Sequence, residues 1–143
     1  MGKAAAALGL CCVIGMTPLA HGDAVSERLI DDALVAEARD LVASPVVAVS
    51  LRTANIQRDG MDVMAIKALD DQWRGEGEAP RQPLVATMLS SPLSNYLTRV
   101  QAHSGGLFTE IFIVGRLGLN VGQSAVTSDM WQGDEAKFLR TFP

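Results

Sequence analysis

The stretch that decides the fold runs from Phe108 to Phe142 and reads FTEIFIVGRLGLNVGQSAVTSDMWQGDEAKFLRTF. Its first part belongs to an apolar run, Leu107 to Val114, whose β-branched and aromatic residues favour a strand over a helix. The segment Arg116-Leu117-Gly118 predicts a tight turn, because Gly118 can adopt the positive φ that such a turn needs. A second run, Leu119 to Ser124, then predicts the partner strand of an antiparallel hairpin.

The chain before the hairpin carries helical patterns. Apolar residues recur there at spacings of three and four, which gives each segment an apolar stripe. Ser44 and Ser91 each stand before a proline, and Ser-Pro is typical of an N-cap followed by the first helical residue. Helices followed by a sheet indicate an α+β fold. The predicted helices are Ala24 to Ala43, Pro45 to Gln57, the segment from the cap Asp62 to Arg74, Leu84 to Leu89, and Pro92 to His103.

The stripes also predict which side chains form the core. Trp73 lies on one helical face with Ile66 and Leu69, so it is interpreted as a core residue rather than a ligand contact. His103 is expected at a helix C-terminus, where a partial positive charge is favoured, rather than at a functional site. Two alternative faces of the second helix remain open, one through Val46, Val49 and Thr53 and one through Val47, Ser50 and Ala54.

Residues 1 to 22 have the pattern of a secretory signal peptide. Lys3 supplies the positive start, residues 4 to 16 form an uncharged apolar run, and Ala20-His21-Gly22 places small residues at the cleavage site. Cleavage there, or two residues later, predicts a periplasmic protein with a single domain of residues 23 to 143. An uncleaved anchor is the alternative, although the apolar run is shorter than the roughly 20 residues that span a bilayer.

Removal of the signal peptide limits the chemistry of the mature chain. Cys11 and Cys12 leave with it, so no disulfide or thiolate chemistry remains, and His103 becomes the one histidine. The mature chain carries 11 basic and 16 acidic residues, a net charge of −5, without a basic cluster, which argues against nucleic acid as a partner. Asp31-Asp32 and Asp70-Asp71 are adjacent on helices, so the side chains of each pair diverge. The sequence therefore predicts no enzyme, no cofactor and no metal site.

Trp131 is the candidate wall of a small-molecule pocket, because it follows a polar loop and lies on no helical stripe. Ser128, Asp129 and Gln132 lie beside it and supply hydrogen-bond donors and acceptors. Asp129 could pair with an ammonium group of a ligand, or it could form an Asx turn that shapes the loop. Asp134 is a further candidate, with capping of the helix expected to start at residues 133–135 as the alternative role.

Several motifs resemble those of periplasmic Cache (PDC-type) sensor domains, which have a PAS-like fold. The matching segments lie between about residues 24 and 142 and read SPVVAVSLRTAN, ALDDQWRGE, PLSNYLTRVQ, IFIVGRLGLNVGQS and TSDMWQGDEAKF, of which the last is the most specific. The resemblance implies N-terminal helices packed on an antiparallel PAS-like sheet, and a sensing role for a small molecule such as an amino acid, an amine or an organic acid. It also implies a membrane partner, a sensor kinase or a chemoreceptor, because the chain has no signalling segment of its own.

The chain departs from the family pattern in three respects. Relatives tend to carry an Asp where this chain has Gly115, and an aromatic where it has Met130. The resemblance also implies further strands that would pair the open edge of the hairpin. We therefore expect a shortened sensor domain with an incomplete sheet, and a possible homodimer through the open edge. The alternative is a non-catalytic interaction protein that retains the fold without a working pocket.

Overall fold

The computed structural model describes residues 31–142, so the predicted signal peptide and the start of the helix predicted from Ala24 lie outside the described residues. Ala36–Pro143 form one compact unit, which is described below. Within the described chain the fold is α+β, as predicted. Its elements are α2 (Asp32–Ala43), α3 (Pro45–Gln57), α4 (Val63–Gly77), α5 (Pro83–Leu89), α6 (Pro92–His103), β1 (Phe112–Val114), β2 (Asn120–Gln123) and α7 (Ala136–Thr141).

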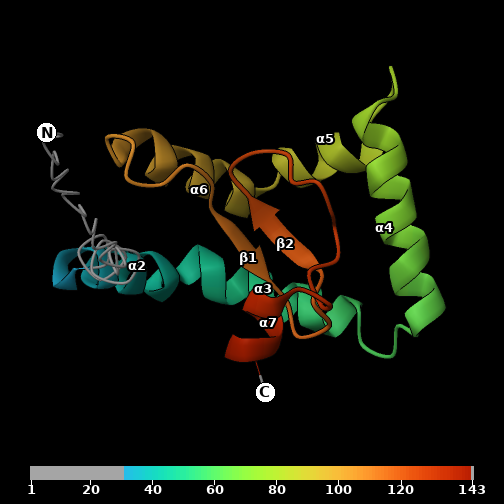
Figure 1. The fold of residues 1–143 in the computed structure, drawn as a ribbon, viewed down its shortest axis with the longest axis horizontal. Coiled ribbons are helices and arrows are strands. Elements are labelled where there is room, and N and C mark those ends of the chain that lie inside the picture. The colour runs from blue at the N-terminus through green and yellow to red at the C-terminus, as the bar shows by residue number, and fades with distance from the viewer. Residues whose placement is uncertain (1–30, 143) are drawn as a thin grey trace, which may run out of the picture. The chain divides into compact units, whose positions relative to one another are not determined.

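The two strands form the predicted antiparallel hairpin, which lies between α6 and α3 (Figure 1). Phe112 pairs with Gln123 and Ile113 with Gly122, and a register shift follows Ile113. The turn reverses through Gly118, whose φ of 78° confirms the predicted left-handed position. A side chain there would also meet a neighbouring backbone, because an added Cβ would lie 2.5 Å from the Cα of Gly133.

The first strand is shorter than predicted, beginning at Phe112 rather than at Leu107. Phe108 and Thr109, at the start of the predicted strand, bond to the end of α6 instead of to β2. The backbone N–H of Phe108 donates to the hydroxyl of Ser104, and Gln101 donates to the carbonyl of Thr109. These side-chain contacts replace the ladder that a longer strand would need.

The sheet has two strands, as expected, and a later segment lies along one edge of the hairpin. Met130 to Gln132 runs antiparallel beside the start of β2. The N–H of Asn120 donates to the carbonyl of Met130, the N–H of Gln132 donates to the carbonyl of Gly118, and Leu119 forms a bridge with Trp131. The polar loop after the hairpin therefore returns to cover the edge of β2, and only the edge of β1 stays unpaired within residues 31–142.

Two hydrophobic clusters hold these elements together. One unites α4 and α5 with the hairpin turn and the returning segment, and the other unites α3 and α6 with the face of the sheet. The predicted roles of Ile66 and Trp73 as core residues are confirmed, and Leu69 packs against the same cluster. Of the two faces proposed for α3, the one with Val47 and Ala54 is buried. The clusters are Ile66, Trp73, Val85, Met88, Leu119 and Met130, and Leu41, Val47, Leu93 and Leu97.

The helix ends agree with the sequence at most positions. Asp62 caps α4 by accepting from the N–H of Ala65 at 2.8 Å, and Ser91 caps α6 by accepting from the N–H of Ser94 at 3.1 Å. Ser44 occupies the N-cap position of α3 and Pro45 begins the helix, as predicted, but the side chain of Ser44 makes no cap bond. His103 ends α6 and stays exposed, as predicted.

Helix α4 continues to Gly77, three residues beyond its predicted end at Arg74. Glu76 accounts for the extra length. Its Oε2 accepts from the backbone N–H groups of Leu84 at 2.7 Å and Val85 at 3.1 Å, so it provides an acceptor for the first free N–H groups of α5. These bonds to a buried carboxylate offset the cost of about 1 kcal/mol for each glycine in the last turn.

Candidate ligand-binding site

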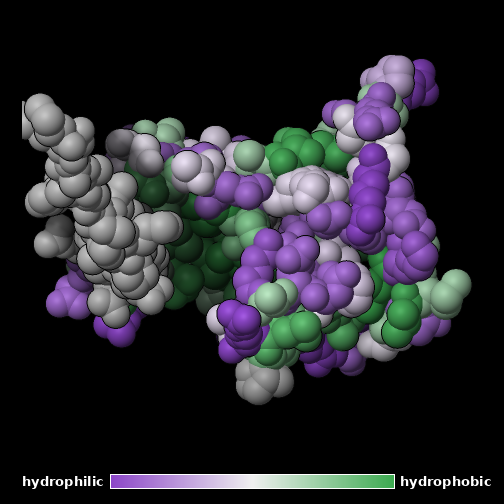
Figure 2. Space-filling model, in the orientation of Figure 1, coloured by the Kyte–Doolittle hydropathy of each residue, from purple (hydrophilic) through white to green (hydrophobic). Residues whose placement is uncertain are grey.

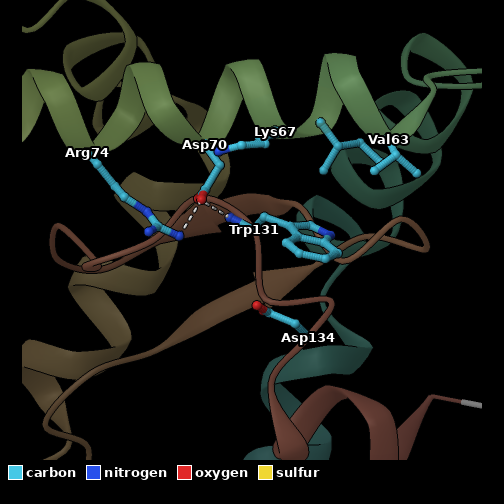
Figure 3. Close-up of a pocket in the computed structure, with 7 residues that line it drawn as sticks. Val63, Lys67, Asp70, Arg74, Trp131 and Asp134 are labelled. Atoms are coloured by element: carbon cyan, nitrogen blue, oxygen red, sulfur yellow. Dashed lines mark hydrogen bonds and ion pairs between the residues drawn. The ribbon is translucent and has the colours of Figure 1, made fainter.

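The site is built around Asp70, a buried carboxylate on the inner face of α4. Its Oδ1 accepts hydrogen bonds from the backbone N–H groups of both Met130 and Trp131, each at 2.9 Å. Only 4 % of the residue is exposed, so both bonds are shielded from water. Asp70 therefore fastens the segment that carries Trp131 to the helix (Figure 3).

Arg74 extends this anchor to a second point of the same loop. It donates from Nη2 to Oδ2 of Asp70 at 2.5 Å and from Nε to Oδ1 of Asp129 at 3.0 Å. The negative charge of Asp70 is the main reason that the pKa of Arg74 lies above its ordinary value, and Asp129 adds to the effect. The three side chains form an acid–base–acid chain between α4 and the loop.

The loop itself is shaped from inside by buried polar groups. Asn120 Nδ2 lies within hydrogen-bond distance of Gln123 Oε1 at 3.1 Å, and Thr127 Oγ1 donates to the carbonyl of Asp129 at 2.8 Å. Trp73 Nε1 donates to the carbonyl of Thr127 at 2.8 Å. The core tryptophan therefore helps to set the path of the chain towards Trp131.

A cavity of about 260 Å³ lies between α4 and the Trp131 segment. The indole of Trp131 is half-buried on one wall, and its Nε1 donates to the carbonyl of Leu117 at 2.9 Å, which fixes the ring. The cavity combines apolar walls with charged groups of both signs (Figure 3). It is lined by Val63, Ile66, Lys67, Asp70, Arg74, Trp131 and Asp134.

Two of the five predicted site residues, Trp131 and Asp134, line this cavity. Asp129 lies outside the lining, and its carboxylate is engaged by Arg74 and by the hydroxyl of Ser128 rather than by a turn amide. Ser128 is exposed, whereas Gln132 is buried and donates to the carbonyl of Asp129 at 3.0 Å. These three residues support the loop around the cavity without lining it.

Asp134 does not cap a helix, which corrects the alternative role considered for it. Helix α7 begins at Ala136, with Glu135 in the N-cap position and no side-chain cap bond. Met130, which stands where relatives of the resembled family tend to carry an aromatic, lies in the core and does not line the cavity.

Sequence reasoning missed Lys67, Asp70 and Arg74 as site residues. A signal was present, because Asp70 follows Ile66 by four residues and precedes Trp73 by three, which places an acid on the apolar stripe. An acid on a buried stripe needs a partner, and Arg74 stands one turn further along. Lys67 pairs with Asp71 at 2.9 Å, so Asp70 and Asp71 diverge as predicted.

Residues 31–142 contain no group of three or more His, Cys, Asp or Glu side chains placed to hold a metal ion. No helix in the described part of the chain is long and apolar enough to cross a membrane. Comparison of the chain with protein-family models, with curated proteins and with solved structures finds no match.

Proposed function

We propose that this chain is a non-catalytic sensor module that binds a small molecule in the cavity between α4 and Trp131, and that it acts in the periplasm. The observation that carries the proposal is the fixed indole of Trp131 on the wall of a cavity whose lining is partly apolar and partly charged. Ligand sites in proteins have this composition, with apolar walls that supply affinity and a few polar groups that set orientation.

The charged groups at the cavity favour an amino acid, an amine or an organic acid as the ligand. Among the described residues Lys67 is engaged only by Asp71, in an exposed pair, and such pairs contribute little, so a ligand carboxylate can compete for Lys67. Asp134 is exposed and forms no ion pair among the residues described, so it can receive an ammonium group. A volume of about 260 Å³ lies just below the usual range of roughly 300–1,000 Å³ for drug-sized ligands and therefore suits a small metabolite.

The position of Trp131 offers a route by which a bound ligand could change the fold. Its backbone is bonded both to Asp70 on α4 and, through the bridge to Leu119, to the hairpin. A ligand that moves the indole would therefore act on the contact between helix and sheet. In this proposal a membrane partner, a sensor kinase or a chemoreceptor, reads that change, in keeping with the resemblance to Cache domains.

The test is a thermal-shift screen of the full-length chain against amino acids, amines and organic acids. A ligand present at 100 times its dissociation constant should stabilise the protein by about 2.7 kcal/mol. Val63→Trp should abolish this response, because Val63 lines the cavity but is 75 % exposed, so a larger side chain can fill the cavity without entering the core. Met64→Trp is the matched control, since Met64 is equally exposed at 73 % and does not line the cavity.

Two results would contradict the proposal. One is a screen in which no compound stabilises the wild-type chain, which would favour an interaction protein without a working pocket. The other is a ligand whose effect persists in Val63→Trp, which would place the binding site elsewhere.

Export has a separate test. The charge, apolar run and small-residue site within residues 1 to 22 support cleavage by signal peptidase. N-terminal sequencing of protein from the periplasm should begin at Asp23 or Val25. Recovery of the chain from the cytoplasm with Met1 intact would contradict export.

A further inference from the structure

The outer edge of β1 has no partner strand in the part of the chain that the structure describes. The carbonyl of Ile111 accepts from the N–H of Ser124, so the backbone of Ile111 faces β2. Along an antiparallel strand, successive residues direct their backbone N–H and C=O groups alternately to one side of the strand and to the other. Ile113 therefore also faces β2, while the N–H and C=O groups of Phe112 and Val114 point towards the open edge. Phe112, Ile113 and Val114 include no proline and no charged residue, and no strand covers this edge within residues 31–142, although sheet edges are usually protected by such features.

Apolar grooves lie on both sides of this edge. A groove of about 320 Å³ runs between β1 and the end of α2, and Val42, which is 54 % exposed, lies in it. A second groove of about 340 Å³ separates β1 from α7, where the rings of Phe138 and Phe142 stack with their centroids 5.2 Å apart. Figure 2 shows the first groove as a recessed hydrophobic surface where the end of α2 faces β1. A strand added at the edge would cover apolar surface on both of its faces.

We propose that a second copy of this chain occupies the edge, with the two β1 strands paired antiparallel about a two-fold axis at Ile113. This register sets Phe112 of each copy opposite Val114 of the other, so the outward N–H and C=O groups of both residues find partners. The result is a continuous four-stranded sheet in the order β2–β1–β1–β2. A two-fold contact of this kind is closed, because the same surface is used once by each copy.

Charge complementarity supports a second copy as the occupant. The same register places Glu110 of each copy opposite Arg116 of the other, which gives two cross-strand ion pairs. Glu110 is exposed and makes no ion pair among the described residues. Arg116 pairs with Asp59, but both side chains are largely exposed, so the guanidinium remains accessible to a second carboxylate.

The experiment is sedimentation velocity of the full-length chain over a range of concentrations, with charge-reversal variants. The wild type should form a dimer. Glu110→Arg and Arg116→Glu should each weaken it by about tenfold or more, because like charges then face each other at two places. The double variant restores opposite charges and should return the dissociation constant to within a few fold of the wild type. Glu78→Arg and Arg81→Glu, which reverse exposed charges away from β1, should leave the dimer unchanged.

Several outcomes would overturn the inference. A wild type that stays monomeric at every concentration would show that the edge is not used, or that residues 1–30 of the same chain cover it. The register would be refuted if neither single charge reversal weakened the dimer. It would also be refuted if the double reversal did not restore the dissociation constant. Growth beyond a dimer would refute the closed two-fold contact.

Discussion

Removal of the Asp70 carboxylate should loosen the whole segment that carries Trp131. In Asp70→Ala two backbone N–H groups lose their acceptor, and the amide of Met130 belongs to a residue that is only 1 % exposed. A hydrogen bond to a charged group contributes about 1.5–3 kcal/mol, so the two bonds together account for roughly 3–6 kcal/mol. Relief of the buried charge offsets part of this loss, and Arg74 adds little because its side chain is 56 % exposed. We expect the free energy of unfolding to fall by about 3–5 kcal/mol.

Asp70→Asn removes the negative charge but keeps an oxygen that can accept the two hydrogen bonds. Its amide oxygen can still accept from both N–H groups, whereas the ionic contact with Arg74 is lost. The expected destabilisation is therefore smaller, about 1.5–3 kcal/mol. Because this variant keeps the shape of the side chain, it should fold and report on the site even if Asp70→Ala does not.

Urea denaturation of the full-length chain, followed by circular dichroism, measures these changes. Asp71→Ala is the matched control, because Asp71 is the neighbouring acid on the same helix and its exposed pair with Lys67 should contribute less than about 1 kcal/mol. The reasoning would be refuted if both Asp70 variants unfolded within 1 kcal/mol of the wild type, or if their effect equalled that of Asp71→Ala.

Other positions offer independent tests. Gly118→Ala should lower the free energy of unfolding by about 1–2 kcal/mol or more, because φ is positive there and a backbone atom lies 2.5 Å from the new Cβ. In the same urea assay, Gly75→Ala should stabilise the protein by about 0.5–1 kcal/mol, because the new Cβ on α4 meets no other atom within contact distance. Ser91→Ala should cost about 1 kcal/mol by loss of a cap, and Ser44→Ala, where no cap bond exists, should cost clearly less. Burial opposes ionisation of Glu76, but hydrogen bonds from Gln72 and from two backbone N–H groups outweigh it and lower its pKa. The stabilisation by ionised Glu76 is therefore present above the unfolded pKa of about 4.3 and is lost as pH falls through the folded pKa. The Tm of Glu76→Gln should therefore lie below that of the wild type at pH 7, and the difference should disappear at acidic pH.

Local patterns predicted most of the fold. The helical stripes identified Ile66 and Trp73 as core residues, and the capping roles of Asp62 and Ser91 followed from their positions before helical segments. The antiparallel hairpin followed from the turn at Gly118. Each of these features depends on residues close together in the sequence.

The remaining features depend on contacts between distant residues. Asp70 and Trp131 are 61 positions apart, and no local pattern joins them. The extension of α4 to Gly77 depends on bonds from Glu76 to the next helix, which overcome the low helix propensity of glycine. The return of the Trp131 segment to the edge of β2 likewise depends on pairing that only the folded chain brings together.

The most direct measurement of the central proposal uses the indole N–H signals of the two tryptophans in a ¹H–¹⁵N spectrum. Trp131 lines the cavity and donates to Leu117, whereas Trp73 is buried in the core and donates to Thr127. Titration with a compound that stabilises the chain in the thermal screen should shift the Trp131 signal progressively and saturably while the Trp73 signal moves little. A saturating compound that leaves the Trp131 signal in place, or that moves only Trp73, would contradict ligand binding in this cavity.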